Sequence, residues 1–480
     1  MKKKTRRIMF WSIVGLFVVA GAWLLVYSFG YRVDWQTLQI SQTGGLYIKT
    51  SPKITDVFLD GENTNKKSGL LSTGIFVQNL FPRSYQLKIA KEGYFDWSKK
   101  VQIEPSLVNN FSHIILLPQS PLKENVYEAT STVEITDFFP LGNKEEILLE
   151  TKIKNKSGWF GALSLFNNKN ATTTEIFRKK ITSTENPDLL SGFVLDDSNP
   201  NQIIFSDYSR SSGQTIFYLW DRLDPDQTVN LSQAASAYNL TKIRKIVFYP
   251  FEDGKYIIET SKNIAVLDLN RKEKSFLAAE NPLDFTISGG NLFWLDKEGG
   301  VYSYNFILKN TSPLAIIESE KIEITNWAVS VNSSSIAVLM KNNELLLIRS
   351  GQPVKIISPV AQNFSFSPDN KKLAYQEVNG QVKIYFLEDF NQDINKKLGE
   401  EVTLDGLTVD VSSQMLWFKD SYHLIVQNGE KIMFAEIDDR DKFNIFQYQF
   451  GLGRYILNGE GVIFRSWGSL LEKINLIISE

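Results

Sequence analysis

Residues 364–386, FSFSPDNKKLAYQEVNGQVKIYF, contain three short strand patterns separated by two turns. An apolar strand pattern runs into the turn Pro368–Lys371, and Lys372–Gln376 leaves it with mostly apolar residues. Asn379-Gly380 is a strong hairpin signal, and Val382–Phe386 follows it as the third strand pattern. The stretch therefore predicts a small antiparallel sheet.

Similar short segments, in which a strand pattern runs into a turn, recur from Asn125 to the C-terminus, and we call them centres. Together with the one around Phe366 they number eight, and the other seven are Phe139-Pro140, Phe193–Asp196, Phe248-Tyr249-Pro250, Phe285–Gly289, Val329–Asn332, Trp417–Ser421 and Ile456–Gly459. Their mean spacing is about 45 residues, which is the period of propeller blades. We therefore expect a β-propeller over residues 125–480. It has seven blades if the first and last fragments share a blade by strand exchange, and eight is the alternative.

A blade of four short strands cannot bury both faces alone, whereas a ring of blades stacks each sheet against the next. Helices are expected to be few here, because no amphipathic stretch of period 3.6 interrupts the region. The turn Ser367-Pro368-Asp369 resembles the degenerate WD-like repeats of TolB-type propellers, although no Trp-Asp pair recurs at a fixed spacing. That resemblance implies the same ring architecture.

The N-terminal region begins with a basic flank, residues 1–7, followed by an uncharged apolar run, Ile8–Phe29. As a helix, these 22 residues would reach about 33 Å, enough to cross a bilayer. The five cations of the flank place the N-terminus in the cytoplasm by the positive-inside rule. We therefore expect a signal-anchor in the cell membrane that makes a single pass, with the bulk of the chain in the cell envelope outside.

A cleaved secretory signal is the alternative, because Ala20-Gly21-Ala22 has the small-x-small form of a cleavage site. The apolar run continues beyond that point through Trp23 to Tyr27, where a signal peptide should already have turned polar. Both interpretations export the chain, and only the first leaves it anchored in the lipid bilayer through residues 8–29. With only residues 1–7 inside, a signalling output would need a partner.

After a linker at residues 30–44, residues 45–118 alternate as short strands and turns, which predicts a small antiparallel β-sandwich. The characteristic segments, in order, are Thr50-Ser51-Pro52, Val57–Gly61, Leu80-Phe81-Pro82, Tyr85-Gln86-Leu87 and Glu92-Gly93-Tyr94. In this order they resemble the PEGA domain, a small surface β-module. The resemblance implies a binding or spacer module with no catalytic residues to carry over, and the whole chain resembles a membrane-anchored bacterial protein with a C-terminal propeller.

Composition excludes several functions. The chain carries a net charge of −2, and without the +5 of the basic flank the remainder carries −7 with no basic block, so a nucleic-acid partner is not expected. Cysteine is absent, which suits an oxidising envelope and removes disulfides and thiolate chemistry. Aromatic residues make up 12% of the chain, which favours β-structure.

Few residues are candidates for a chemical site. The chain has two histidines, His113 and His423, and each is expected to be a structural residue on a strand in its own domain. Asp221, Asp224 and Asp226 cluster in one loop, and oxygen-rich loops of this kind can hold calcium. The spacing is not that of an EF-hand and Pro225 indicates a plain turn, so no cofactor is expected and calcium is the alternative. No catalytic residues are assigned.

The sequence therefore predicts a membrane-anchored envelope protein that presents the sandwich and the propeller for binding or scaffolding. The expected partner is a surface protein or cell-wall glycan. The alternative is an enzyme that acts on glycan through carboxylates in the propeller channel, whose stereochemistry would follow from the distance between two carboxyl groups.

Overall fold

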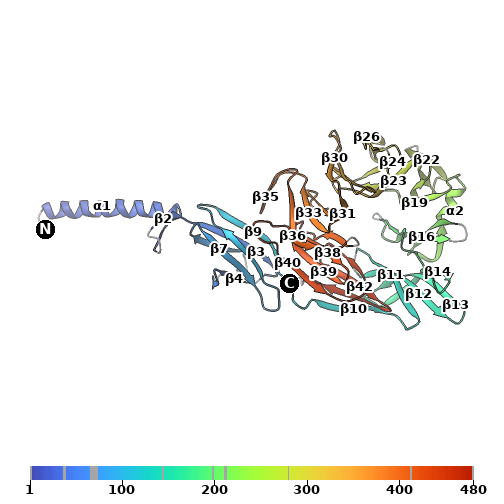
Figure 1. The fold of residues 1–480 in the computed structure, drawn as a ribbon, viewed down its shortest axis with the longest axis horizontal. Helices are drawn as coiled ribbons and strands as arrows, with labels where there is room; N and C mark the ends of the chain where they lie inside the picture. Colours follow the sequence, from blue (N-terminus) through green and yellow to red (C-terminus); the bar gives the residue numbers. More distant parts are fainter. Residues whose placement is uncertain are drawn as a thin grey trace.

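The structure is a computed structural model of the chain. It describes residues 3–35, 39–53, 55–64, 74–142, 145–196, 199–209, 213–278, 281–319, 321–410 and 413–477. Three parts follow one another along the longest axis (Figure 1). They are an N-terminal helix, a β-sandwich and a ring of β-sheets.

The helix α1 (Lys3–Ser28) is exposed along its length, and it is long and apolar enough to cross a membrane or to act as a signal sequence. The linker predicted at residues 30–44 is not simply extended. It contains a hairpin of β1 (Tyr31–Asp34) and β2 (Gln39–Gln42), and Gly30, with φ +82°, makes the turn from helix to hairpin.

The β-sandwich packs two sheets around one core that includes Leu46, Val57, Leu87 and Trp97. One sheet has the order β6-β3-β9 and the other β5-β4-β7-β8. The strands are β3 (Gly44–Ser51), β4 (Asp56–Leu59), β5 (Glu62–Asn63), β6 (Ile75–Leu80), β7 (Ser84–Ala90), β8 (Trp97–Gln102) and β9 (Val108–Ile115).

One feature of the sandwich differs from the sequence prediction. We expected antiparallel strands throughout, but β3 and β9 pair in parallel, from Gly45 opposite Val108 to Ser51 opposite Ile115. The second sheet lies between these two strands in the sequence, so their pairing follows from how the sheets stack and not from a hairpin turn.

From Leu122 onward the described residues form eight four-stranded sheets, which we call blades 1 to 8. Blade 1 is β11 (Val133–Pro140), β12 (Glu146–Asn155), β13 (Gly158–Asn167) and β14 (Thr172–Ile181); blade 2 is β15 (Val194–Leu195), β16 (Gln202–Ser209), β17 (Gln214–Asp221) and β18 (Asp224–Asn230); blade 3 is β19 (Ile243–Phe248), β20 (Lys255–Thr260), β21 (Ile264–Asp268) and β22 (Glu273–Ala278); blade 4 is β23 (Pro282–Ser288), β24 (Asn291–Asp296), β25 (Gly300–Asn305) and β26 (Asn310–Ile316). Blade 5 is β27 (Ile324–Val329), β28 (Ile336–Met340), β29 (Leu345–Ile348) and β30 (Lys355–Ser358); blade 6 is β31 (Ala361–Phe366), β32 (Lys372–Glu377), β33 (Gln381–Phe386) and β36 (Glu401–Thr408); blade 7 is β37 (Gln414–Trp417), β38 (His423–Asn428), β39 (Lys431–Glu436) and β40 (Ile445–Gln449); blade 8 is β41 (Arg454–Leu457), β42 (Val462–Trp467), β43 (Leu470–Asn475) and β10 (Leu122–Glu128).

Two short elements are inserted between these strands. The hairpin of β34 (Phe390–Asn391) and β35 (Asn395–Lys396) lies within blade 6, and α2 (Leu231–Ser236) joins blades 2 and 3. The Asn230 side chain accepts a hydrogen bond from the backbone N–H of Gln233 and so caps α2. Leu231 and Ala235 bury one face of this helix between the two blades.

The ring is closed by apolar cores. Each pair of neighbouring blades shares one buried cluster, and blade 8 shares one with blade 7 and another with blade 1. Phe434 and Ile463 belong to the first of these two clusters, and Phe138 and Phe464 to the second. Closure therefore buries both faces of every blade, including the first and the last.

The ring has eight blades, which is the alternative count, and the first and last parts of the region still share one blade by strand exchange. β10 precedes blade 1 in the sequence but pairs with β43 as the outermost strand of blade 8. The fourth strands, such as β14 and β18, are largely exposed, while the first strands of several neighbouring blades contact one another and line the axis of the ring. All eight sequence centres lie in or directly after these first strands.

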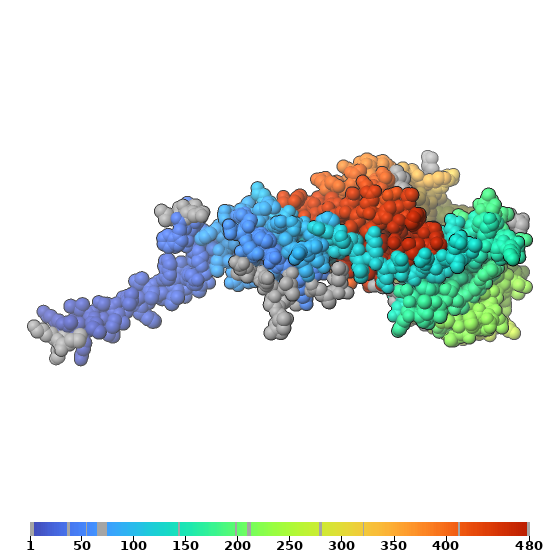
Figure 2. All heavy atoms as spheres, turned by 90° about the horizontal axis from the view of Figure 1, so that it is seen from below, coloured from blue at the N-terminus to red at the C-terminus, as the bar shows by residue number. Residues whose placement is uncertain are grey.

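The sandwich packs against blades 6, 7 and 8 (Figure 2). Ile115 and Leu117, at the end of the sandwich, are buried in the cluster that joins blades 7 and 8. The Phe95 ring stacks on Phe446 of β40, with 5.6 Å between ring centroids. The sandwich is therefore packed directly on the ring.

Candidate functional site

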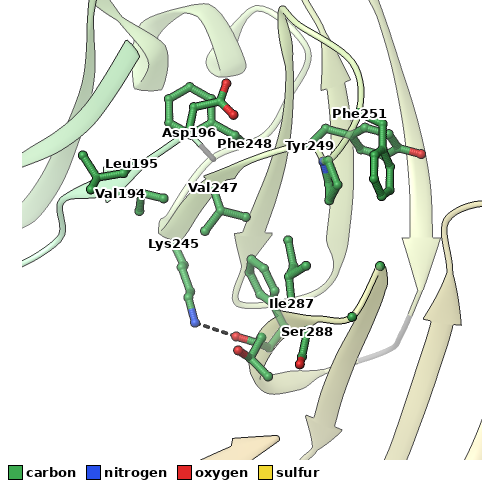
Figure 3. Close-up of a pocket in the computed structure, with 15 residues that line it drawn as sticks. Val194, Leu195, Asp196, Lys245, Val247, Phe248, Tyr249, Phe251, Ile287 and Ser288 are labelled. Atoms are coloured by element: carbon green, nitrogen blue, oxygen red, sulfur yellow. Dashed lines mark hydrogen bonds between the residues drawn. The ribbon is translucent and has the colours of Figure 1, made fainter. Parts of the chain in front are cut away.

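The first candidate site is a cavity of about 590 Å³ at the axis of the ring. It is lined by the first strands of blades 2, 3 and 4 and by the turns that follow β19 and β23 (Figure 3). These are the sequence centres Phe193–Asp196, Phe248–Pro250 and Phe285–Gly289. The repeat that builds the ring therefore brings three turns together around one hollow, whose lining is mainly aromatic and aliphatic.

Phe251 is the most unusual residue of this lining. Its side chain is 66% exposed although it is a large aromatic group, and its backbone has φ +72°. Bulky residues rarely adopt this left-handed conformation, and such strained residues cluster at ligand-binding sites. In Figure 3 Phe251 lies beside Tyr249 at one end of the cavity. An exposed ring held in this way can stack on an apolar or sugar face.

A chain of polar contacts crosses blades 3, 4 and 5 next to the cavity. Lys245 Nζ donates to Asp284 Oδ1 at 2.9 Å and to the Phe285 carbonyl at 2.5 Å. Trp327 Nε1 donates to Asp284 Oδ2 at 2.8 Å, so both carboxylate oxygens of Asp284 are occupied. These contacts hold the charged groups at the wall of the cavity in place.

Glu259 adds a titratable group behind this wall. Its side chain is almost fully buried and forms an ion pair with Arg244, which also donates to the Pro282 carbonyl at 2.5 Å. Burial raises the pKa of the Glu259 carboxyl to about 7, even though Arg244 opposes this shift. A carboxyl group with such a pKa can exist in both protonation states near neutral pH.

Two further charged groups lie on the first strands of blades 8 and 1. Arg454 Nη2 lies 2.8 Å from Asp137 Oδ2. Burial raises the pKa of Asp137, while Arg454 opposes that shift. Asp137 of β11 and Asp284 of β23 are therefore each paired with a cation.

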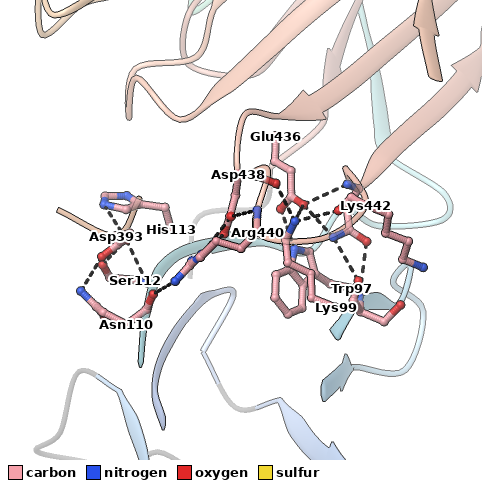
Figure 4. A network of polar contacts seen from close by, with 12 residues as sticks. Trp97, Lys99, Asn110, Ser112, His113, Asp393, Glu436, Asp438, Arg440 and Lys442 are labelled. Atoms are coloured by element: carbon pink, nitrogen blue, oxygen red, sulfur yellow. Dashed lines mark hydrogen bonds and ion pairs between the residues drawn. The ribbon is translucent and has the colours of Figure 1, made fainter. Parts of the chain in front are cut away.

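A second polar site joins the sandwich to blade 7 (Figure 4). Lys99 is fully buried, and its Nζ lies 2.7 Å from Glu436 Oε1 and donates at 2.7 Å to the carbonyls of Asp438 and Lys442. Trp97 Nε1 donates to the other Glu436 oxygen at 2.8 Å. All donors of the ammonium group are used, as a buried charge requires.

The two histidines meet at this interface, although the sequence places them in different domains. The His113 ring stacks on Tyr422 with 3.6 Å between centroids, and Nε2 lies 3.5 Å from Asp393 Oδ2. Burial lowers the pKa of His113, although Asp393 opposes this shift. His423 Nδ1 lies 2.7 Å from Asp420 Oδ2. From the sequence, each histidine was expected to be a structural residue within its own domain. The sequence did not predict that both would lie at the interface between the two domains.

The three aspartates considered for calcium do not converge. Asp221 accepts hydrogen bonds from Gln202 Nε2 and from the backbone N–H of Leu223, each at 2.8 Å. Asp224 and Asp226 are exposed on β18. Within the part of the chain that the structure describes, no group of three or more acidic, histidine or cysteine side chains is placed to hold a metal ion.

Comparison with known proteins identifies the sandwich. Residues 43–114 match the PEGA domain family. The match covers the two sheets of the sandwich, which is called the PEGA module below. It agrees with the resemblance drawn from the sequence segments. The search of curated proteins found no match to this chain.

Among solved structures, similar chains include Hsv2 from Kluyveromyces lactis, with 11% identity, a TM-score of 0.40, and coverage of 66% of this chain and 98% of that one. The computationally designed Ika8 protein has 11% identity and a TM-score of 0.44, with coverage of 74% and 100%. Neither identity is high enough to transfer a ligand or partner to this chain.

Sequence reasoning missed most residues of both sites. Phe251, Lys245 and Glu259 belong to no motif, and Lys99 is an ordinary lysine on an alternating strand. Only the recurring centres could have indicated the cavity from the sequence, because three of them contain turn residues that line it.

Proposed function

We propose that this protein is a membrane-anchored binding protein of the cell envelope. α1 is the anchor, the PEGA module is a rigid spacer, and the axial cavity of the propeller binds the ligand. The expected ligand is part of a surface protein or a cell-wall glycan. The cavity carries this proposal, because it combines a mainly apolar lining with an exposed, strained aromatic ring and a few fixed polar groups, as ligand sites do.

The interface between the PEGA module and blade 7 supports the spacer role. Lys99, Trp97 and Glu436 form a buried network there, and Tyr448 of blade 7 donates to the Pro118 carbonyl at 2.6 Å. A hinge between the two domains would have to break these buried contacts. The module therefore holds the propeller in one orientation relative to the anchor.

An enzyme that acts on glycan is the second candidate, and the raised pKa of Glu259 is the observation that favours it. Glycoside hydrolysis uses two carboxyl groups on either side of the scissile bond. Asp284 and Asp137 are each held by a cation, and Glu259 lies behind the wall. Binding without catalysis is the better supported role. Glycan hydrolysis that is lost in Glu259→Gln would reverse this preference.

Sedimentation tests the binding role. The full chain in lipid nanodiscs is mixed with isolated cell wall, or with immobilised surface proteins of the source cells, and the bound fraction is measured. Phe251→Ala is expected to reduce binding severalfold, because it removes the exposed ring. Phe276→Ala is the matched control, since Phe276 is 57% exposed on the outer strand of the same blade. The proposal fails if neither material binds, or if both variants bind like the wild type.

A further inference from the structure

The hairpin that follows the helix has two chemically different faces. Side chains alternate between the faces of a strand, and directly paired residues share a face. Val33 pairs with Ile40 and Tyr31 with Gln42, and Trp35 continues the same alternation just beyond β1. The opposite face carries Arg32, Asp34, Gln39 and Ser41. The hairpin is therefore amphipathic, with Tyr31, Val33, Trp35 and Ile40 as its apolar face.

This apolar face is largely uncovered. Trp35 is 81% exposed, Ile40 is 62% exposed and Tyr31 is 40% exposed. Among the described strands, β1 and β2 pair only with each other, and their residues belong to none of the buried clusters of the PEGA module or the propeller. A two-stranded hairpin of this size is marginally stable in water, so an external surface that covers the apolar face would stabilise it.

The end of α1 holds the hairpin in place. Thr43 donates its backbone N–H to the Gly30 carbonyl at 2.9 Å, and Gln42 Nε2 donates to the Phe29 carbonyl at 2.9 Å. Arg32 lies over the Tyr27 ring at 3.5 Å and donates to the Tyr27 carbonyl at 2.7 Å. The hairpin projects sideways from the helix end, across the helix axis (Figure 1). If α1 crosses a bilayer, the hairpin lies along its surface.

We infer that the β1–β2 hairpin is seated in the outer headgroup region of the bilayer, with Tyr31, Val33, Trp35 and Ile40 directed toward the lipid. Tryptophan and tyrosine favour this region, because their rings are apolar while their N–H and O–H groups reach water. Asp34 lies on the opposite face, and Arg32 reaches back to the Tyr27 carbonyl at the end of α1. Since Thr43 leads directly into β3, the seated hairpin fixes how the PEGA module stands on the membrane. This inference rests on the membrane anchorage proposed above.

Spin labelling tests this position, because the chain has no cysteine and each variant therefore carries a single label. Trp35→Cys and Ile40→Cys are labelled with a nitroxide in the full chain, reconstituted in phosphatidylcholine and phosphatidylglycerol vesicles. The accessibility of each label to oxygen, divided by its accessibility to a water-soluble nickel complex, reports the depth of the label in the bilayer. We expect a ratio severalfold higher at both positions than at Gln39→Cys, which lies in β2 on the opposite face of the hairpin.

Two further labels separate this inference from the anchorage itself. Phe17→Cys, in the middle of α1 and 77% exposed, should have the highest ratio, and Ile307→Cys, on the propeller and also 77% exposed, the lowest. A high ratio at Phe17 with ratios at Trp35 and Ile40 equal to those at Gln39 and Ile307 would overturn the seated hairpin alone. A low ratio at Phe17 would overturn the anchorage, and the seated hairpin with it.

Discussion

At the scale of single residues, the most constrained charge at the interface between the PEGA module and the propeller is Lys99. Its ammonium group is completely buried, and its partners, Glu436 and two carbonyls, all come from blade 7. A buried ion pair adds little stability compared with a well-packed apolar pair, but removing one partner leaves an unpaired buried charge. Replacing Lys99 alone should therefore lower the free energy of unfolding.

We predict that Lys99→Met lowers the free energy of unfolding by about 3–5 kcal/mol, because Glu436 then remains buried without its cation. Chemical denaturation of the detergent-solubilised full chain measures this change. Lys100→Met is the matched control. The Lys100 side chain is next to Lys99 in the sequence but exposed, so a change in the free energy of unfolding within about 0.5 kcal/mol is expected. Equal effects of the two substitutions would contradict the assigned role of Lys99.

His113 predicts a dependence of stability on pH. Because burial lowers its pKa in the folded protein below the ordinary value of 6.5, the unfolded chain binds more protons in the interval between the two values. His113 therefore contributes stability above pH 6.5 that is lost as the pH falls through the lowered pKa. His113→Phe keeps a ring against Tyr422 but does not titrate.

We expect the denaturation midpoint of the wild type to fall more steeply on acidification below pH 6.5 than that of His113→Phe. The comparison isolates His113 from other groups that titrate in the same range, such as Glu259. Parallel pH profiles of the two proteins would show that the His113 imidazole contributes nothing to the pH dependence.

At the scale of elements, β10 is the strand that completes the ring. It lies before blade 1 in the sequence but pairs with β43, and Val126 is buried in the cluster between blades 8 and 1. The strand therefore couples the start of the propeller to its end. Damage to β10 should open the ring at one defined seam, while blades 3 to 6 keep their neighbours.

We predict that Val126→Asp destabilises the propeller by about 3–5 kcal/mol, because it buries an uncompensated charge at the seam. Hydrogen exchange should increase first in blades 8 and 1. Leu122→Asp lies in the same strand at a position 60% exposed, and it should change stability by no more than about 0.5 kcal/mol. Uniform loss of protection round the ring would argue against a local seam.

At the scale of the whole molecule, the PEGA module and the propeller share a buried interface. The two are joined in sequence by the short segment between Ile115 and Leu122, in which Gln119 and Ser120 are exposed. Their non-covalent contacts include the buried Lys99 network, the stacking of His113 on Tyr422, and Arg440, which lies 3.8 Å over the Phe111 ring. These contacts should hold the parts together without the covalent connection.

A protease site inserted between Ser120 and Pro121 tests this expectation. After cleavage, the fragment that contains the anchor and the PEGA module should co-elute with the propeller fragment in size-exclusion chromatography, because the buried interface remains. The same cleavage in Lys99→Met should release the two fragments. Separation of the wild-type fragments at micromolar concentration would show that the interface is too weak to act as a rigid connection.

Local chemistry explains how much the sequence determined by itself. The apolar composition of Ile8–Phe29 already specifies a long helix. Each blade repeats the same turn after its first strand, so eight centres correspond to eight blades. The PEGA module was recognisable because its turns keep a characteristic order, and residues 43–114 match that family. All these features depend on residues close together in the chain.

Only the tertiary structure decided the rest. The parallel pairing of β3 with β9, the meeting of His113 and His423, and the Lys99–Glu436 pair join residues far apart in the sequence. The axial cavity exists because the ring brings the turns of blades 2, 3 and 4 together around one point. Such contacts follow from closure and docking, which bury whole surfaces at once, and no short sequence pattern encodes them. The sequence therefore determined the kind of repeat, and the tertiary structure decided the number of blades and where the sites lie.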